Sequence, residues 1–156
     1  MPGHDAIVVT LGISEPTLSV RFRGARGTPN DVRSRATAII VDVARHNGIK
    51  RVVVQSSYGV GPTRSRLGWL DRLFVALLIK PQLEDTEIQE RHIRGSDLDW
   101  TIVQPVFLTD KPSIAHFLST DGTTRKRSVS RRGLAQVHAD LAEGLTMVGQ
   151  TVAVSG

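Results

Sequence analysis

The sequence contains no cysteine, no leader-like segment and no long hydrophobic run. Without cysteine the chain forms no disulfide, thiolate zinc site or iron–sulfur cluster, so a disulfide-stapled secreted fold is excluded. The longest apolar run, residues 73–79, is far shorter than the roughly 20 residues that span a bilayer. The first apolar stretch follows Asp5, without the basic segment and cleavage site of a secretory signal. We therefore expect a cytoplasmic protein that crosses no membrane.

The length and composition predict a single domain over residues 1–156. A chain of 156 residues with 40% apolar residues is long enough to bury one sizeable core. Sixteen of the 20 basic residues are arginine, and the formal net charge is +5. A guanidinium group stays protonated at any ordinary pH, so the chain favours anionic partners without identifying one.

The first half of the chain predicts a strand, a helix and a second strand. Residues 4–12 form a continuous apolar run rich in β-branched residues, which is typical of a strand buried on both faces. After an irregular loop over residues 13–30, helical spacing of apolar residues predicts a helix over 29–47, with Arg33 on its polar face. Residues 51–56 predict a second buried strand, so the two strands should be parallel.

The second half continues the alternation of helices and strands. We expect an apolar helix over residues 67–78 that Pro81 ends or kinks, and a more polar helix over 82–94. A strand over residues 100–104 follows, then a helix capped by Ser130 and a last strand over 150–154. The whole pattern indicates an α/β fold with a parallel, doubly wound sheet.

Ligands of open parallel sheets bind beyond the carboxyl ends of the strands, which selects three segments: residues 10–13, 56–58 and 105–108. Gly12 either lets a flat ligand approach the backbone or simply ends the strand in a turn. The hydroxyls of Ser56, Ser57 and Tyr58 could bind a substrate carbonyl or donate a proton to it. The alternative is that the serines only form a turn at the end of the strand.

Other candidate sites are weaker. The five histidines lie far apart without helical pairing, so no metal site is predicted. The basic residues 125–132, and the arginines between residues 21 and 26, could contact phosphate but read better as solvated loops. Nucleic acid is an improbable partner because no aromatic residue interleaves with the basic stretch. The apolar cluster over residues 69–77 is either core or a dimer contact.

Four segments carry a resemblance to a known family. They are DAIVVTLG at residues 5–12, KRVVVQSSY at 50–58, QE at 89–90 followed by SDLDWTIVQP at 96–105, and SVSRRGLA at 128–135. In this order and spacing they resemble the NAD(P)H-binding, atypical short-chain dehydrogenase/reductase family, which includes flavin reductase-like and NmrA-like proteins. The resemblance implies a three-layer Rossmann-like fold around a parallel sheet.

The resemblance also implies a cofactor site and a reaction. Thr10, Leu11 and Gly12 would lie near the adenosine ribose and pyrophosphate of NADP or NAD, with NADP favoured. Ser56, Ser57 and Tyr58 would lie near the nicotinamide, and Pro105, Val106, Phe107 and Leu108 would flank its ring. The implied function is hydride transfer from NAD(P)H to a small organic acceptor such as a flavin or a quinone, with Ser57 and Tyr58 as catalytic residues.

Two departures from the family leave an alternative open. Pro62 stands four positions after Tyr58, so the Tyr-x-x-x-Lys pair of classical members is absent. A non-catalytic dinucleotide-binding or redox-sensing module of the NmrA-like kind is therefore the second interpretation. The glycine-rich strand, loop and helix that open family members are also missing.

Because the glycine-rich strand, loop and helix are missing, the sequence predicts an incomplete fold. We expect the second half of a doubly wound fold, truncated at its N-terminus relative to the family, either because the sequence is a fragment or misassigned start of a longer protein or because it is a natural short form. Its first strand, over residues 6–11, would then have an unpaired apolar edge, which favours a homodimer.

Overall fold

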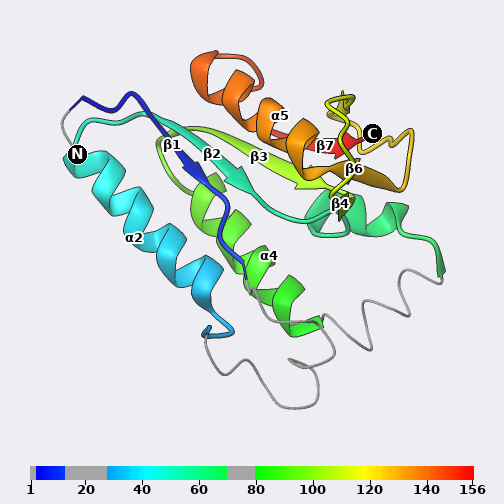
Figure 1. The fold of residues 1–156 in the computed structure, drawn as a ribbon. Coiled ribbons are helices and arrows are strands. Elements are labelled where there is room, and N and C mark those ends of the chain that lie inside the picture. Colours follow the sequence, from blue (N-terminus) through cyan, green and yellow to red (C-terminus); the bar gives the residue numbers. More distant parts are fainter. Residues whose placement is uncertain (1–2, 13–27, 70–79) are drawn as a thin grey trace.

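The computed structural model describes residues 3–12, 28–69 and 80–156, which form layers of helices around a central sheet (Figure 1). The strands are β1 (Ala6–Val9), β2 (Arg51–Gln55), β3 (Asp99–Pro105), β4 (Phe107–Thr109), β5 (Phe117–Ser119), β6 (Ser128–Ser130) and β7 (Gln150–Ser155). The helices are α2 (Val32–His46), α4 (Lys80–Arg94) and α5 (Arg131–Glu143), with a 3-10 helix, η1, at Gly61–Arg66. None of the helices in these residues is long and apolar enough to cross a membrane.

The main sheet has the strand order β1-β2-β3-β7-β5. The first four strands pair in parallel, with Val9 beside Val54 and Val54 beside Ile102. β5 pairs antiparallel with β7, and β4 and β6 form a separate two-stranded parallel sheet. The predicted α/β fold with a mostly parallel sheet is confirmed, and β5 adds an antiparallel edge to it.

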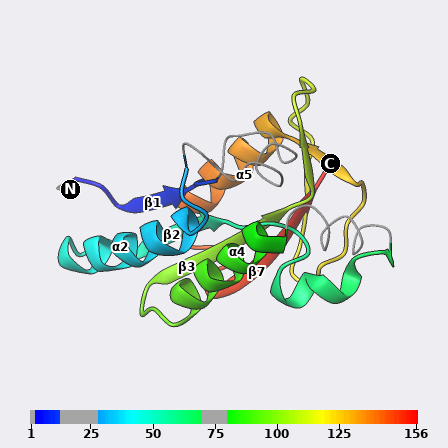
Figure 2. The same cartoon turned by 90° about the horizontal axis from the view of Figure 1, so that it is seen from below.

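Helices cover the two faces of the sheet and make three layers. Figure 2 shows α5 on one side of the sheet and both α2 and α4 on the other. The carboxyl ends of β1, β2 and β3 share one edge because these strands are parallel. That edge is where polar side chains from different strands come together.

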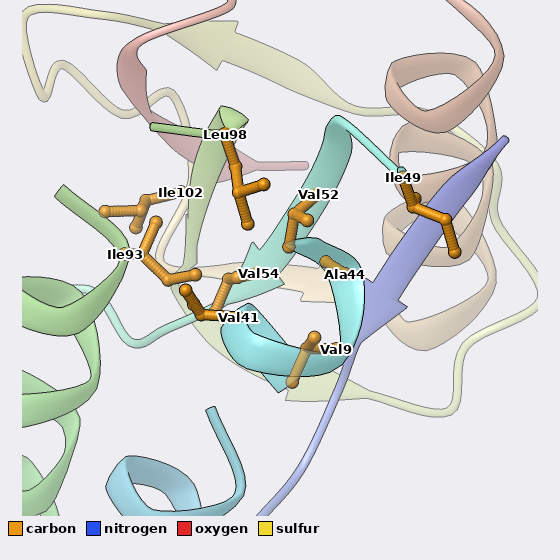
Figure 3. Packing of buried hydrophobic residues seen from close by; sticks show 9 residues of the cluster. All are labelled: Val9, Val41, Ala44, Ile49, Val52, Val54, Ile93, Leu98 and Ile102. Carbon is orange, nitrogen blue, oxygen red and sulfur yellow. The ribbon is translucent and has the colours of Figure 1, made fainter. Parts of the chain in front are cut away.

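The core between the sheet and α2 and α4 consists of apolar residues that point to one face of their strands (Figure 3). Val52 and Val54 of β2 pack there with Ile102 of β3, against Ala44 and Ile93 of the two helices. Their neighbours in the strands point to the opposite face and pack under α5; this second cluster contains Val53, Val103, Val152, Leu134, Val137 and Leu141. The predicted burial of β2 follows directly from this alternation, and β3 is buried on both faces in the same way.

The first turn of α2 is held by a carboxylate from α4. Asp85 accepts hydrogen bonds from the backbone nitrogens of Arg33 at 3.0 Å and Ser34 at 3.1 Å, and from the Ser34 hydroxyl at 2.5 Å. An anion at a helix N-terminus satisfies free N–H groups and interacts favourably with the helix dipole. This contact explains why α2 begins at Val32 rather than at the predicted residue 29.

The structure also differs from the sequence-based expectation at several elements. Pro81 is the second residue of α4 as described, and the helix that it was predicted to end or kink lies mostly outside the described residues. The predicted apolar helix and cluster between residues 67 and 78 fall mostly on residues 70–79, outside the described part, as does most of the predicted loop over 13–30. Val8 is 42% exposed, so β1 is not buried on both faces as predicted. The side chain of Val8 lines a pocket beside α5 instead of packing into a core.

Candidate functional site

A pocket of about 520 Å³ lies at the carboxyl ends of β1 and β2, on the face of the sheet that α5 covers. Val8 and Thr10 of the first strand segment, Gln55 of β2 and Leu108 of β4 form one side. The other side comes from α5: Arg131, Leu134, Ala135, His138 and Ala139. This volume falls within the range of small-molecule sites, roughly 300–1,000 Å³.

The pocket has apolar walls and a few polar groups. Its polar side chains are Thr10, Gln55, Arg131 and His138. The Arg131 guanidinium donates to the carboxylate of Asp110 at 2.7 Å, and this exposed ion pair brings a positive charge to the rim. Apolar walls with a few polar groups are typical of sites for small organic molecules.

His138 is fixed and uncharged in this pocket. Its side chain is buried, and its Nε2 lies 3.1 Å from the Gln55 Oε1, which requires the proton on Nε2. Burial lowers the pKa of His138 from 6.5 to about 4. The imidazole is therefore neutral near pH 7, so it is no proton donor of general-acid type there.

A second polar cluster lies where β2 and β3 end. The buried carboxylate of Glu90, in α4, accepts hydrogen bonds at Oε1 from the Ser56 hydroxyl at 2.5 Å and the Gln104 amide at 2.7 Å. Its Oε2 lies 2.9 Å from the guanidinium of Arg94. Three elements are thus joined at one buried anion.

The same cluster anchors the segment that follows β2. Gln104 donates to the carbonyl of Val60 at 3.0 Å and accepts from the Thr63 hydroxyl at 2.8 Å. Tyr58 donates its hydroxyl proton to the Gly122 carbonyl at 2.8 Å, and its backbone nitrogen donates to Pro105. The position of Ser57 and Tyr58 therefore depends on contacts with β3 and with the loop at residue 122.

The predicted site residues divide between the pocket and these neighbouring clusters. Thr10 and Leu108 line the pocket. Gly12 lies beside Arg33, and Leu11 packs against the core under α2. Ser56 is only 1% exposed, and its hydroxyl is turned inward to Glu90.

The remaining predicted residues surround the end of β3. Ser57 is half-buried, and Pro105 is buried within β3. Val106 donates its backbone N–H to Val154 and packs under α5. Phe107 is 55% exposed.

Sequence reasoning missed three side chains at this edge of the sheet: Arg33, Gln55 and His138. Arg131 belongs to the basic stretch that was interpreted as a solvated loop, and it lines the pocket. Gln55 is the last residue of a strand that was recognised, so the rule for strand ends would have included it. Arg33 was placed on the polar face of its helix, whereas it is half-buried with its guanidinium 3.4 Å from the Gln55 carbonyl. His138 carries no local signal, since it meets Gln55 across 83 residues.

Comparison with known proteins identifies the family of this chain and solved structures that share its fold. A model of the NAD(P)H-binding family matches residues 1–144. A candidate NAD-dependent epimerase/dehydratase from Bacillus halodurans is 25% identical, with a TM-score of 0.71 over 97% of this chain. Two others share the fold: a short-chain dehydrogenase/reductase from Veillonella parvula in complex with NADP (20% identity, TM-score 0.68, 79% of this chain) and an anaerobilin reductase from Escherichia coli (18%, 0.70, 96%).

The chain is shorter than these neighbours. It covers 64% of the Bacillus chain, 58% of the Veillonella chain and 63% of the Escherichia chain, which is less than two thirds of each. No curated protein matches the chain.

Proposed function

Because this chain belongs to the NAD(P)H-binding family, we propose that it is an oxidoreductase of the atypical short-chain dehydrogenase/reductase type that uses a nicotinamide dinucleotide at the carboxyl edge of its sheet. The observation that carries the proposal is the pocket of about 520 Å³ at that edge. Ligands of doubly wound sheets bind beyond the carboxyl ends of the strands. The family and the position of the pocket therefore point to the same ligand.

The residues of the pocket fit the nicotinamide end of the dinucleotide. Leu108 and Leu134 offer apolar contact to a ring, and Gln55 offers a hydrogen-bonding group to its amide. Thr10, which the resemblance assigns to the adenosine ribose and pyrophosphate, lines the same pocket. When bound, the dinucleotide supplies hydride, and we propose a small organic molecule such as a flavin or a quinone as the acceptor. The protein then contributes position and the exclusion of water.

Ser57 and Tyr58 are the proposed proton-handling residues. The Tyr58 hydroxyl already donates to the Gly122 carbonyl, so a substrate must displace that bond to receive the proton. Ser57 is half-buried in the segment held by Gln104 and Thr63. This difference favours Ser57 as the group that contacts a substrate carbonyl and Tyr58 as the group that positions the loop.

A non-catalytic dinucleotide sensor is the second candidate function. It is favoured by Pro62, which stands where classical relatives have the lysine of the catalytic pair, and by the engaged hydroxyl of Tyr58. Such a module would bind the dinucleotide without turning it over. Oxidation of NADPH in the presence of an acceptor distinguishes the two functions.

We expect the purified chain to bind NADPH or NADH in the micromolar range in a calorimetric titration, and to oxidise it when flavin or quinone is added. Ser57→Ala should lower the oxidation rate and leave the dissociation constant unchanged, because the hydroxyl is proposed to act on the substrate. Binding without oxidation would support the sensor. Absence of binding to both dinucleotides would refute both functions.

We also propose that the cofactor is NADP rather than NAD and that two chains associate through β1. The cofactor proposal rests on the family resemblance, and the same titration compares NADPH with NADH.

The dimer proposal rests on the position of β1 at the sheet edge with Val8 42% exposed. Light scattering at micromolar concentration is expected to give the mass of a dimer, and a monodisperse monomer would contradict it.

A further inference from the structure

The side chain of Arg33 reaches the edge of the sheet where β1 and β2 end. Its backbone nitrogen is fixed to Asp85 at 3.0 Å in the first turn of α2. From there Nη1 donates to the Gln55 carbonyl, the last residue of β2, at 3.4 Å. Nη2 would lie 2.9 Å from a Cβ at Gly12, just beyond β1. The guanidinium therefore lies between the ends of two parallel strands.

Most of the hydrogen-bonding capacity of this group is unused in the described part of the chain. A guanidinium has five N–H donors, and here one long bond engages it. Burial lowers the pKa of Arg33 and the charge of Asp85 opposes that shift, yet an arginine stays protonated near pH 7. A partly desolvated cation with free donors interacts more strongly with an anion than an exposed one does.

The backbone of α2 does not compete for that anion. Asp85 accepts from the nitrogens of Arg33 and Ser34 and from the Ser34 hydroxyl, so a carboxylate already occupies the start of the helix. A second anion approaching this edge would meet the side chain of Arg33. Gly12 keeps the adjoining space open, because any side chain there would press against the guanidinium.

We propose that Arg33 binds a phosphate group of the dinucleotide at the ends of β1 and β2. The inference rests on the proposed function, since it assigns the anionic part of that ligand to a residue. The planar guanidinium group can donate two parallel hydrogen bonds to two oxygens of one phosphate group. The phosphate is either in the pyrophosphate, common to both dinucleotides, or in the 2′-phosphate, present only in NADPH.

The test compares Arg33→Gln with Arg35→Gln in calorimetric titrations with NADPH and NADH. Arg35 lies two residues further along the same helix, with 73% of its side chain exposed and only a 3.8 Å ion pair with Asp31, so it is the matched control. We expect R33Q to raise the dissociation constant about tenfold or more and R35Q to change it less than twofold. R33K, which keeps the charge but not the fork, should lie between R33Q and the wild type. Thermal unfolding of each variant checks that the fold is retained.

The outcomes separate this inference from the proposed function. A larger loss for NADPH than for NADH assigns the contact to the 2′-phosphate, and equal losses assign it to the pyrophosphate. If the wild type binds and R33Q binds as tightly as R35Q, the inference is wrong and the proposed function stands. If the wild type binds neither dinucleotide, both fail.

Discussion

Replacing Glu90 with alanine is expected to lower the free energy of unfolding by about 3–5 kcal/mol. The carboxylate is 1% exposed and joins Ser56, Gln104 and Arg94 from three different elements. Its removal leaves buried donors without an acceptor and also creates a cavity, and both effects are costly. Since domains of this kind are stable by only about 5–15 kcal/mol, urea unfolding at pH 7 should show a large shift of the midpoint.

The matched control for this experiment is Glu87→Ala on the same helix. Glu87 also forms a 2.9 Å ion pair, with Arg64, but its side chain is 26% exposed and its partner's is 57% exposed. Exposed pairs contribute about 0–1 kcal/mol, so E87A should unfold close to the wild type. Glu90→Gln keeps an oxygen for Ser56 and Gln104 and loses only the ion pair, so its loss should be intermediate. Equal destabilisation by E90A and E87A would show that Glu90 is not a structural centre.

The order of strands and helices could be predicted because it depends on local hydrophobic patterns. β2 and β3 are apolar runs buried on both faces, and helical spacing located α2. Ser130 was recognised as a cap, and its side chain accepts from the nitrogen of Gly133. β4, β5 and β6 have three residues each, too few to show any period. β5 pairs with β7, and β4 pairs with β6. These strands therefore depend on partners elsewhere in the chain, which a local sequence pattern does not show.

The candidate site could be predicted only as far as the ends of strands. Thr10 and Leu108 follow strands and do line the pocket. Ser56 follows one too, yet its hydroxyl turns inward because a carboxylate 34 residues away lies beneath it. Gln55 and His138 meet only through packing of α5 on the sheet. Contacts of this kind join residues that are far apart in the sequence. They cannot be predicted from the spacing of residues within either segment.

Acidification from pH 7 to pH 4 is expected to remove about 2–3 kcal/mol of stability through His138 alone. The neutral ring is buried in the folded protein, where its pKa is about 4, whereas an unfolded histidine titrates near 6.5. The unfolded state therefore binds a proton first as the pH falls. This contribution to stability is fully present above pH 6.5, is lost progressively between pH 6.5 and 4, and is constant below that range.

Carboxylates also titrate in acid, so the contribution of His138 must be isolated by difference. His138→Gln keeps a side-chain donor for Gln55 but carries no titrating group, whereas His92→Gln removes a histidine that is exposed on α4. Urea unfolding at several pH values should give H138Q a flatter pH dependence than the wild type between pH 6.5 and 4.5, and H92Q shows the effect of removing an exposed histidine. Because the difference between two variants cancels the carboxylates common to both, parallel curves for H138Q and the wild type would mean that the ring is protonated without cost. In that case the imidazole of His138 would have to be hydrated in the folded protein. α5 would then not pack against the sheet closely enough to bury this side of the pocket.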